Sequence, residues 1–458
     1  MQIHPLDNVE VRADGQKYAL SEIKKGENVM KYGFPIGSAT ENIEIGDRVS
    51  PKNLSSNLKG MDDWEYIPAE TSKTEGRSGT FSGYLRKDGS AGIRNELWII
   101  PTVGCINDVA KTLAAKSGGK ALCHPYGCSQ LGGDLLNTQK ILCGLIRHPN
   151  AGGVLVLGLG CEENGIAIMK TVLGDYDKDR VKFLNIQDCE DEIADGMAII
   201  ADLKARMEKD ERTDIPVSKL NIAVKCGGSD GYSGITANPL VGRAMEYFAE
   251  YGGTVLMTEI PEVFGAEQLL LSRSVSKEAF ASATDMIKAF RQYFIDHGEG
   301  IADNPSPGNI AGGISTLEEK SLGCVQKAGK VPLMGALGFG EKPESDGGLY
   351  LVNGPGNDMV AVTNLAASGA HIILFTTGRG TPLSAPVPTL KIATNSALAA
   401  KKPHWIDFNA GVLLDGADMG AEGEKLFELC LSVANGAKPK SEENGYYDIA
   451  IFKDGVTL

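Results

Sequence analysis

The chain has 458 residues, too many for one small hydrophobic core, so we expect two or three domains. Its formal net charge of −14 argues against nucleic acid as a partner, and no apolar run approaches the roughly 18 residues of a membrane span. The N-terminus does not resemble a signal peptide, and nine cysteines in such a chain indicate a reducing cytoplasm rather than a disulfide framework.

The first 58 residues are typical of a small β module, because short alternating runs are broken by glycines such as Gly33 and Gly46. A module of this size is too small for a deep pocket of its own. His4 lies at its start and, taken alone, is more typical of a surface residue. Residues 59–80 are polar and show no periodicity, so they predict a linker.

From residue 81 the chain alternates between apolar runs and helical patterns. The apolar runs predict buried strands at residues 97–103, 120–123, 153–159 and 181–186. Helical patterns lie between them, for example at residues 108–115 and 191–207. This alternation predicts a parallel α/β sheet, and the charged stretch 208–216 is typical of a domain boundary.

The C-terminal part repeats this pattern. Its predicted strands cover residues 220–224, 254–257, 331–337, 349–352, 371–375 and 404–408. A glycine-rich turn, residues 225–234, lies between the first of these strands and a predicted helix at 240–251. Ligands bind at such turns, at the carboxyl ends of parallel strands. The turn fits neither a phosphate-binding P-loop nor a dinucleotide fingerprint.

Cysteines follow several of the predicted strands: Cys105, Cys128, Cys161 and Cys226. If the strands are parallel, their ends share one sheet edge, where thiolates could hold a soft or borderline metal such as iron or zinc. The alternative for each is a buried cysteine that acts as a small hydrophobic residue. The spacing is not that of a C-x-x-C motif.

Charged side chains also lie at strand ends. Asp230, Glu259, Glu262 and Asp358 are candidate metal ligands or acid–base groups, and helix capping is their alternative role. Lys320 and Arg379 are candidates for binding a substrate carboxylate, for which an arginine offers two parallel donors. For Lys320 the alternative is a solvated helix face.

Several long segments are similar to those of the altronate/galactarate dehydratase family, and together they span essentially the whole chain. They are residues 4–9, 31–37, 94–98, 124–128, 158–162, 226–239, 304–309, 319–323 and 375–382. Residues 355–358 and 401–408 resemble the altronate branch more than the galactarate branch. On these segments the chain is identified as a member of this family.

The resemblance implies an α/β protein with a small N-terminal β-clip (SAF-like) module, residues 1–58, and a linker, residues 59–80. A middle α/β domain used in dimerisation, residues 81–215, and a Rossmann-like catalytic domain, residues 216–458, would follow. It implies a cytoplasmic hydro-lyase, expected as a homodimer, that dehydrates D-altronate to 2-dehydro-3-deoxy-D-gluconate. The alternatives are a dehydratase of galactarate or another sugar acid and, from a different class, a non-catalytic sugar-acid binding protein.

The resemblance also implies iron, as Fe²⁺ with Mn²⁺ as a substitute, and we expect it near Cys128, Cys161, Cys226 and Asp230. A single ferrous ion and a three-cysteine iron–sulfur cluster both stay open. The candidate acids and bases are His4, His124 and Lys320, whose individual roles stay open too. Substrate binding is expected from Lys31, Ser229, Asn238 and Arg379.

Overall fold

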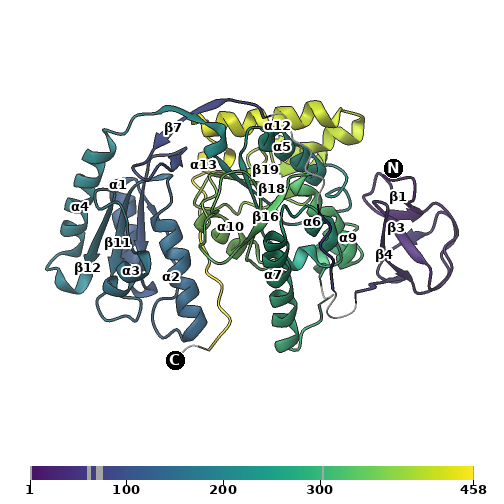
Figure 1. Ribbon diagram of the computed structural model, residues 1–458, viewed down its shortest axis with the longest axis horizontal. Helices are drawn as coiled ribbons and strands as arrows, with labels where there is room; N and C mark the ends of the chain where they lie inside the picture. Colours follow the sequence, from purple (N-terminus) through teal and green to yellow (C-terminus); the bar gives the residue numbers. More distant parts are fainter. Residues whose placement is uncertain (1–2, 59–62, 69–75, 302–303, 457–458) are drawn as a thin grey trace.

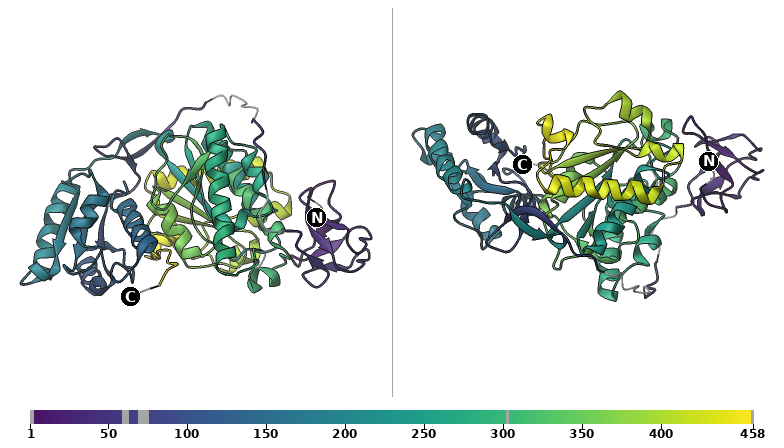
Figure 2. Two further views of the ribbon diagram at one scale, coloured as in Figure 1. Left: turned by 60° about the horizontal axis from the view of Figure 1, so that its bottom comes forward. Right: turned by 90° about the horizontal axis from the view of Figure 1, so that it is seen from above.

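The computed structural model describes residues 3–58, 63–68, 76–301 and 304–456. A middle α/β domain, a larger C-terminal α/β domain and a small N-terminal β module lie roughly in a row (Figure 1). Two further views keep this order, with the N-terminal module and the middle domain on opposite sides of the C-terminal domain (Figure 2). The expected linker lies partly outside the described residues, so the domain limits stay predictions. Among the described helices, none is long and apolar enough to cross a membrane.

The N-terminal module consists of two small antiparallel sheets, as its alternating runs predict. One has the order β1 (Val9–Val11), β2 (Lys17–Ala19), β5 (Arg48–Val49); the other has the order β3 (Asn28–Lys31), β4 (Phe34–Ala39), β6 (Leu54–Ser55). Apolar side chains such as Val29, Ile36 and Ile43 are fully buried between the strands.

The middle domain is a four-stranded parallel sheet with the order β10-β9-β11-β12. Its strands are β9 (Glu96–Pro101), β10 (Lys120–Ala121), β11 (Ala151–Gly158) and β12 (Val181–Asn185). Helices α1 (Asn107–Ser117) and α4 (Glu192–Met207) pack together, as do α2 (Gly132–Ile146) and α3 (Ile166–Leu173). The chain leaves β9 toward β10 and β11 toward β12, so the direction of winding reverses between β9 and β11. Such a reversal opens a crevice at the carboxyl ends of the two strands.

The C-terminal domain is built on a seven-stranded parallel sheet with the order β16-β17-β15-β14-β18-β19-β20. Its strands are β14 (Asn221–Cys226), β15 (Thr254–Met257), β16 (Leu333–Leu337), β17 (Gly348–Val352), β18 (Ile372–Thr377), β19 (Thr389–Ala393) and β20 (Phe408–Asn409). Winding reverses between β14 and β18, so the glycine-rich turn after β14 lies at this crevice. The α/β fold expected from the sequence is confirmed.

Helices surround this sheet. They are α5 (Ala237–Glu250), α6 (Glu267–Leu271), α7 (Lys277–Asp296), α8 (Pro307–Ala311), α9 (Leu317–Cys324), α10 (Asp358–Ala367), α11 (Ser396–Lys401), α12 (Met419–Ala434) and α13 (Lys440–Glu443). Helix α12 packs along α5, and α10 packs against α2 of the middle domain. A Cβ on Gly144 of α2 would lie 2.3 Å from the carbonyl oxygen of Ala367, so the two domains meet closely there.

The stretch 208–216, predicted as a domain boundary, contains β13 (Thr213–Pro216), which pairs with β7 (Thr80–Leu85) next to β8 (Ala91–Gly92). Two other segments differ from the sequence-based prediction. Strand β19 was missed because buried Thr389 and Lys391 interrupt its apolar pattern. The strand predicted at 404–408 is reduced to β20, because residues 403–405 form a turn.

Candidate active site

Strand β14 ends at Cys226, and the turn that follows brings the main chain close to neighbouring elements. A Cβ on Gly227 would lie 2.7 Å from both the Asp358 carboxylate and the Phe375 ring, so a side chain would not fit there. Gly228 has φ +62°, a conformation that glycine adopts without strain. The glycines therefore keep the end of β14 open to side chains from other elements.

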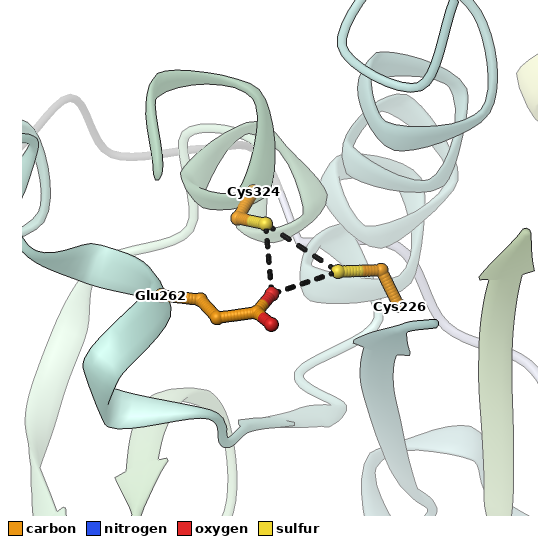
Figure 3. A group of neighbouring side chains, drawn as sticks. All are labelled: Cys226, Glu262 and Cys324. Atoms are coloured by element: carbon orange, nitrogen blue, oxygen red, sulfur yellow. Dashed lines mark hydrogen bonds between the residues drawn. The ribbon is translucent and has the colours of Figure 1, made fainter. Parts of the chain in front are cut away.

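Two thiols and a carboxylate meet at this strand end. Cys226 of β14, Glu262 of the short 3-10 helix η4 (Ile260–Val263) and Cys324 of α9 point toward one another (Figure 3). The Cys226 Sγ lies 3.1 Å from Glu262 Oε2 and 3.4 Å from Cys324 Sγ, and Cys324 Sγ lies 3.2 Å from Glu262 Oε2. We call these residues the buried triad. Among the described residues it is the one group of three or more cysteine, histidine, aspartate or glutamate side chains spaced closely enough to share one metal ion.

Ammonium groups and carboxylates are equal in number in and around the buried triad. Lys320 Nζ lies 2.6 Å from Glu262 Oε1, Lys225 Nζ lies 3.1 Å from Glu259 Oε1, and Lys327 Nζ lies 3.4 Å from Glu259 Oε2. Lys225 also pairs with Asp358. Three ammonium groups therefore compensate three carboxylates, and ionisation of both thiols would leave a charge of minus two. That is the charge a divalent cation neutralises.

The electrostatics of the site follow from burial and from these pairs. Burial disfavours the Glu262 carboxylate, but Lys320 and Lys327 outweigh it and hold the Glu262 pKa at about 2. Burial likewise disfavours the Lys320 ammonium, but Glu262 raises the Lys320 pKa above its ordinary value. The Cys226 thiol and burial raise the pKa of Cys324 well above its ordinary value. When no cation is bound, Cys324 is therefore a neutral thiol, and the nearby Lys320 is protonated.

Glu259, whose side chain contacts the end of β14, has a strained backbone conformation itself. Its φ of +69° lies in the left-handed region, which few residues other than glycine adopt. Its Oε2 accepts a hydrogen bond from the backbone N–H of Cys226 at 3.0 Å. Strain of this kind persists where the surrounding contacts demand it, often at functional sites.

The N-terminal module lies against the same helix that carries Lys320 and Cys324. Glu319 of α9 pairs with Lys17 at 2.8 Å and with Lys31 at 2.7 Å, and all three side chains are buried. Burial disfavours the Glu319 charge, but the two lysines hold its pKa at about 2. This buried ionic contact places the module against the C-terminal domain of its own chain.

Tyr32 enters the site from the N-terminal module. It has φ +61°, and its side chain lies over Gly234, where a Cβ would be only 2.4 Å from the Tyr32 Oη. Tyr32 lines a narrow cavity together with Ser229, Asp230, Lys320 and Cys324, among others. Tyr32 lies in the segment 31–37 that carries the family resemblance, but its place at the cavity could not be predicted, because the docking of the N-terminal module brings it there.

Main-chain contacts complete this docking. A Cβ on Gly231 would lie 2.0 Å from the carbonyl oxygen of Gly15, and one on Gly313 would lie 2.2 Å from the same oxygen. Thr316 donates to the carbonyl of Ile36, and Tyr232 donates to the carbonyl of Arg12 at 3.1 Å. The glycines of the C-terminal domain thus receive the backbone of the module directly.

Of the expected acids and bases, only Lys320 lies in this site. His4 is exposed and packs against Gly33, beside Tyr32. His124 is buried in the middle domain, where its Nδ1 accepts from the Tyr126 N–H at 3.2 Å and its Nε2 lies 2.9 Å from the Pro101 carbonyl. Both ring nitrogens of His124 are occupied by the backbone, which argues against the expected acid–base role.

The expected substrate-binding residues divide in the same way. Ser229 lines the cavity, and Arg379 is exposed on the turn after β18, where it donates to the Gly308 carbonyl at 2.7 Å. Lys31 is paired with Glu319. Asn238 lines the same cavity as Ser229, and its amide donates to the Gly323 carbonyl and accepts from Thr376.

The expected grouping of metal ligands at one sheet edge is wrong. Cys128 and Cys161 follow β10 and β11 of the middle sheet, whereas Cys226 ends β14 of the C-terminal sheet. Both carboxylate oxygens of Asp230 are occupied by hydrogen bonds from four donors: the backbone of Tyr232 and the side chains of Ser233, Thr394 and Asn395. Glu262 and Cys324 join Cys226 instead. Cys324 went unnoticed in the sequence because it follows no strand.

Comparisons with known proteins cover all parts of the chain. Three family models match: the altronate/galactarate dehydratase SAF domain at residues 1–57, the D-galactarate dehydratase/altronate hydrolase second domain at 83–208, and the D-galactarate/altronate dehydratase C-terminal domain at 217–457. The chain is 48% identical to the altronate dehydratase of Bacillus subtilis (strain 168), over 98% of this chain and 94% of that protein.

Two proteins of Escherichia coli (strain K12) are also similar. The identity to its altronate dehydratase is 46%, over 97% of this chain and 92% of that protein. The identity to its galactarate dehydratase (L-threo-forming) is 32%, over 98% of this chain and 91% of that protein.

Proposed function

The chain belongs to the altronate/galactarate dehydratase family, and from that premise we propose that it removes water from D-altronate to give 2-dehydro-3-deoxy-D-gluconate. Its membership makes it a hydro-lyase that acts on a sugar acid. The observation that carries the choice of altronate is the identity of 48% and 46% to two altronate dehydratases, against 32% to a galactarate dehydratase.

The reaction requires one proton acceptor and one proton donor. A base removes the C2 proton, a double bond forms between C2 and C3, and the C3 hydroxyl leaves with a proton as water. The resulting enol then becomes the 2-keto acid. The C2 proton lies beside an ionised carboxylate and is weakly acidic, so the site must stabilise negative charge on the substrate.

We propose that Cys226, Glu262 and Cys324 hold a divalent cation, with Fe²⁺ as the resident ion and Mn²⁺ as a substitute. Two thiolates and a carboxylate are a mixed donor set of the kind that suits iron. The balanced charges around the buried triad support this, because thiolate formation leaves the charge that such an ion offsets. When bound, the ion supplies positive charge that stabilises the enediolate form of the substrate.

Lys320 is the proposed proton donor. Its ammonium group is held by Glu262 at 2.6 Å and by the Asn304 side chain at 3.1 Å, and it lines the cavity. Its ammonium group carries a proton that it can give to the departing C3 hydroxyl, and its raised pKa argues only against Lys320 as the base that takes the C2 proton.

The N-terminal module supplies the cover of the proposed site. Its buried contacts through Lys17 and Lys31 hold it over α9, and Tyr32 brings a hydroxyl to the cavity. A covered site excludes water and strengthens every electrostatic interaction inside it. Ser229 and Arg379 remain as the proposed partners of the substrate hydroxyls and carboxylate.

We also propose that the protein acts in the cytoplasm as a homodimer. All nine cysteines are free thiols, which fits a reducing compartment. Size-exclusion chromatography with light scattering measures the oligomeric state, and a monomer at micromolar concentration would contradict the dimer.

A panel of aldonic and aldaric acids tests the substrate. Protein prepared without oxygen and loaded with Fe²⁺ is incubated with each acid, and the 2-keto product is measured. We expect D-altronate to react and galactarate to react poorly. Equal or faster conversion of galactarate would overturn the altronate assignment. Binding of altronate without any 2-keto product would favour a non-catalytic binding protein.

A further inference from the structure

The proposed reaction leaves unused a second group of cysteines, at the carboxyl edge of the middle sheet. Cys105 follows β9, Cys128 follows β10 and Cys161 follows β11, and all three side chains are exposed. We call them the surface thiols. Cys105 and Cys161 follow the two strands between which the winding of this sheet reverses, the place where open parallel sheets bind ligands.

Main-chain hydrogen bonds lock the three turns together. The Gly104 N–H donates to the Tyr126 carbonyl at 2.8 Å, which joins the first turn to the second. The Asn164 N–H donates to the Gly127 carbonyl at 3.1 Å, which joins the third turn to the second. The Asn164 side chain also donates to the Thr102 carbonyl at 2.9 Å, so the third turn reaches back to the first. The surface thiols therefore stand on one connected framework.

The second turn is built to carry Cys128 in a fixed place. Gly127 has φ +103°, and a Cβ there would lie 2.0 Å from the Thr102 carbonyl oxygen, so only glycine fits. Ser129 has φ +57°, an unusual conformation for a residue with a side chain. His124 braces the turn through both ring nitrogens. Strain of this kind gathers at functional sites.

The surroundings of the surface thiols carry charge of both signs: the Glu163 carboxylate raises the pKa of the Cys128 thiol, whereas helices begin shortly after each cysteine. Cys105 lies in the 3-10 helix η1 (Gly104–Ile106) directly before α1, and Cys128 and Cys161 come shortly before α2 and α3. Helix N-termini carry partial positive charge and stabilise thiolates. Gln130, next to this turn, also has a buried side-chain nitrogen without a hydrogen-bond partner among the described residues.

A single metal ion does not match this arrangement. Two thiolates on one zinc or iron ion can be at most about 4.6 Å apart, twice a metal–sulfur bond of about 2.3 Å. Among the described residues, the surface thiols do not form a group of side chains that close together. In a cubane iron–sulfur cluster each thiolate binds a different iron, so the sulfur atoms stand farther apart.

We propose that Cys105, Cys128 and Cys161 bind a [4Fe–4S] cluster through three thiolates. Each thiol loses its proton and forms one iron–sulfur bond, and the fourth iron keeps a position for a non-protein oxygen ligand such as a hydroxy acid or water. The backbone N–H groups of the three turns and the helix N-termini offset the negative charge of the thiolates and sulfides. This site is separate from the buried triad, which lies on another sheet.

Chemical analysis of the full chain tests the proposal without relying on activity. Protein is reconstituted without oxygen with Fe²⁺ and sulfide and then desalted. We expect about four acid-labile sulfides per chain, together with the visible absorption of a cluster and, after reduction, its electron paramagnetic resonance signal. Incorporation of no labile sulfide would overturn the proposal.

Single variants C105S, C128S and C161S locate the ligands. Each change is at an exposed position, so the fold is expected to persist, and thermal unfolding of the sulfide-free protein checks this. Each variant should lose most of the labile sulfide. C123S and C189S are matched controls, because these half-buried cysteines lie on the same sheet edge and should keep the full sulfide content. Sulfide unchanged in the C105S/C128S/C161S triple variant would contradict the assignment.

Variants of the buried triad separate this site from the proposed catalytic metal. C226S and C324S should lose iron that is not accompanied by sulfide, while the sulfide content stays at that of the parent protein. A cluster that persists in an inactive C324S protein upholds the present proposal. Loss of sulfide in C226S or C324S, with the surface-thiol variants unaffected, would place the cluster on the buried triad and overturn it.

Discussion

The two parallel sheets of this protein carry cysteines at corresponding places, but in opposite surroundings. At the C-terminal sheet, Cys226 and Cys324 are buried with Glu262 among three ammonium groups. At the middle sheet, Cys105, Cys128 and Cys161 are exposed and supported by glycine turns and helix N-termini. Strand order accounts for the place of both groups, at the carboxyl ends of parallel strands. Burial and charged neighbours set the two groups apart, and in our proposals they decide which metal group each one binds.

The largest expected effect comes from removing the buried triad. C226S/C324S should lower kcat/KM by about 1000-fold or more, since the charge stabilisation from a metal ion amounts to several kcal/mol. Iron content and turnover of D-altronate are measured together. C189S is the control, a half-buried cysteine of the middle sheet outside both sites. A double variant with full activity would mean that both buried thiols only fill the core.

A smaller loss is expected when the charge balance around the buried triad is changed. K320M should lower kcat by about 100- to 1000-fold, the usual contribution of a general acid, while KM changes little. K320R retains the charge and should recover part of the rate. The pH–rate profile of the metal-loaded enzyme distinguishes a proton donor from a structural cation. Equal losses for K320M and K320R in KM alone would contradict the donor role.

The N-terminal module covers the candidate active site of the C-terminal domain and not the surface thiols of the middle domain. One added methyl group at this contact should disturb the cover. G234A places a Cβ 2.4 Å from the Tyr32 hydroxyl and 2.9 Å from the Gly323 Cα, so it should displace Tyr32 or α9 and lower kcat/KM by about 10- to 100-fold. G133A is the matched control, because a Cβ at Gly133 meets no atom within 4 Å. Iron content should be unchanged in both variants. If G234A and Y32F are both as active as G133A, Tyr32 has no part in the reaction.

Acid should weaken the middle domain and its contact with the C-terminal domain before it affects the buried triad. His124, His148 and His371 are buried, each with Nδ1 accepting from a backbone N–H and Nε2 beside a backbone carbonyl. Burial lowers the pKa of His124 and His371 to about 4, and that of His148 well below its ordinary value. The unfolded chain takes up these protons below about pH 6.5, so stability falls with pH between 6.5 and 4.

The slope of this loss approaches about 1.4 kcal/mol per pH unit for each histidine. Glu262 behaves differently, because its pKa of about 2 retains its stabilisation until the pH falls below the ordinary carboxyl value. Urea unfolding of metal-free protein between pH 7 and 5 measures the slope, and H124Q should reduce it. Stability independent of pH in this range would contradict the neutral state of the histidines.

Sequence patterns were sufficient for the parts of the fold that depend on local periodicity. The apolar runs predicted both parallel sheets, and the glycine-rich turn after residues 220–224 was found at a crevice of the larger one. Patterns failed where polar residues are buried, as in β19, where Lys391 donates to the Leu383 carbonyl inside the protein.

Only some residues of the site could be predicted from the sequence, for a physical reason. Cys226 and Lys320 stand in distinctive segments, but Cys324 and Tyr32 reach the site through tertiary packing, one from a helix and one from another module. The position of cysteines at strand ends indicated metal binding. It did not indicate whether these strands belong to one sheet or to two. That distinction needs the strand pairing, which separates Cys161 from Cys226.

The contact between Gly15 and the glycines of the C-terminal domain has a consequence for how the cover works. Main chain meets main chain there, so a side chain at Gly231 or Gly313 would push the module away from the C-terminal domain. The polar segment 59–80 tethers the module, and a short tether gives an effective concentration in the millimolar range, on the order of 1 mM. The tether therefore favours this closed contact over what the same two surfaces would reach as separate proteins at low concentration.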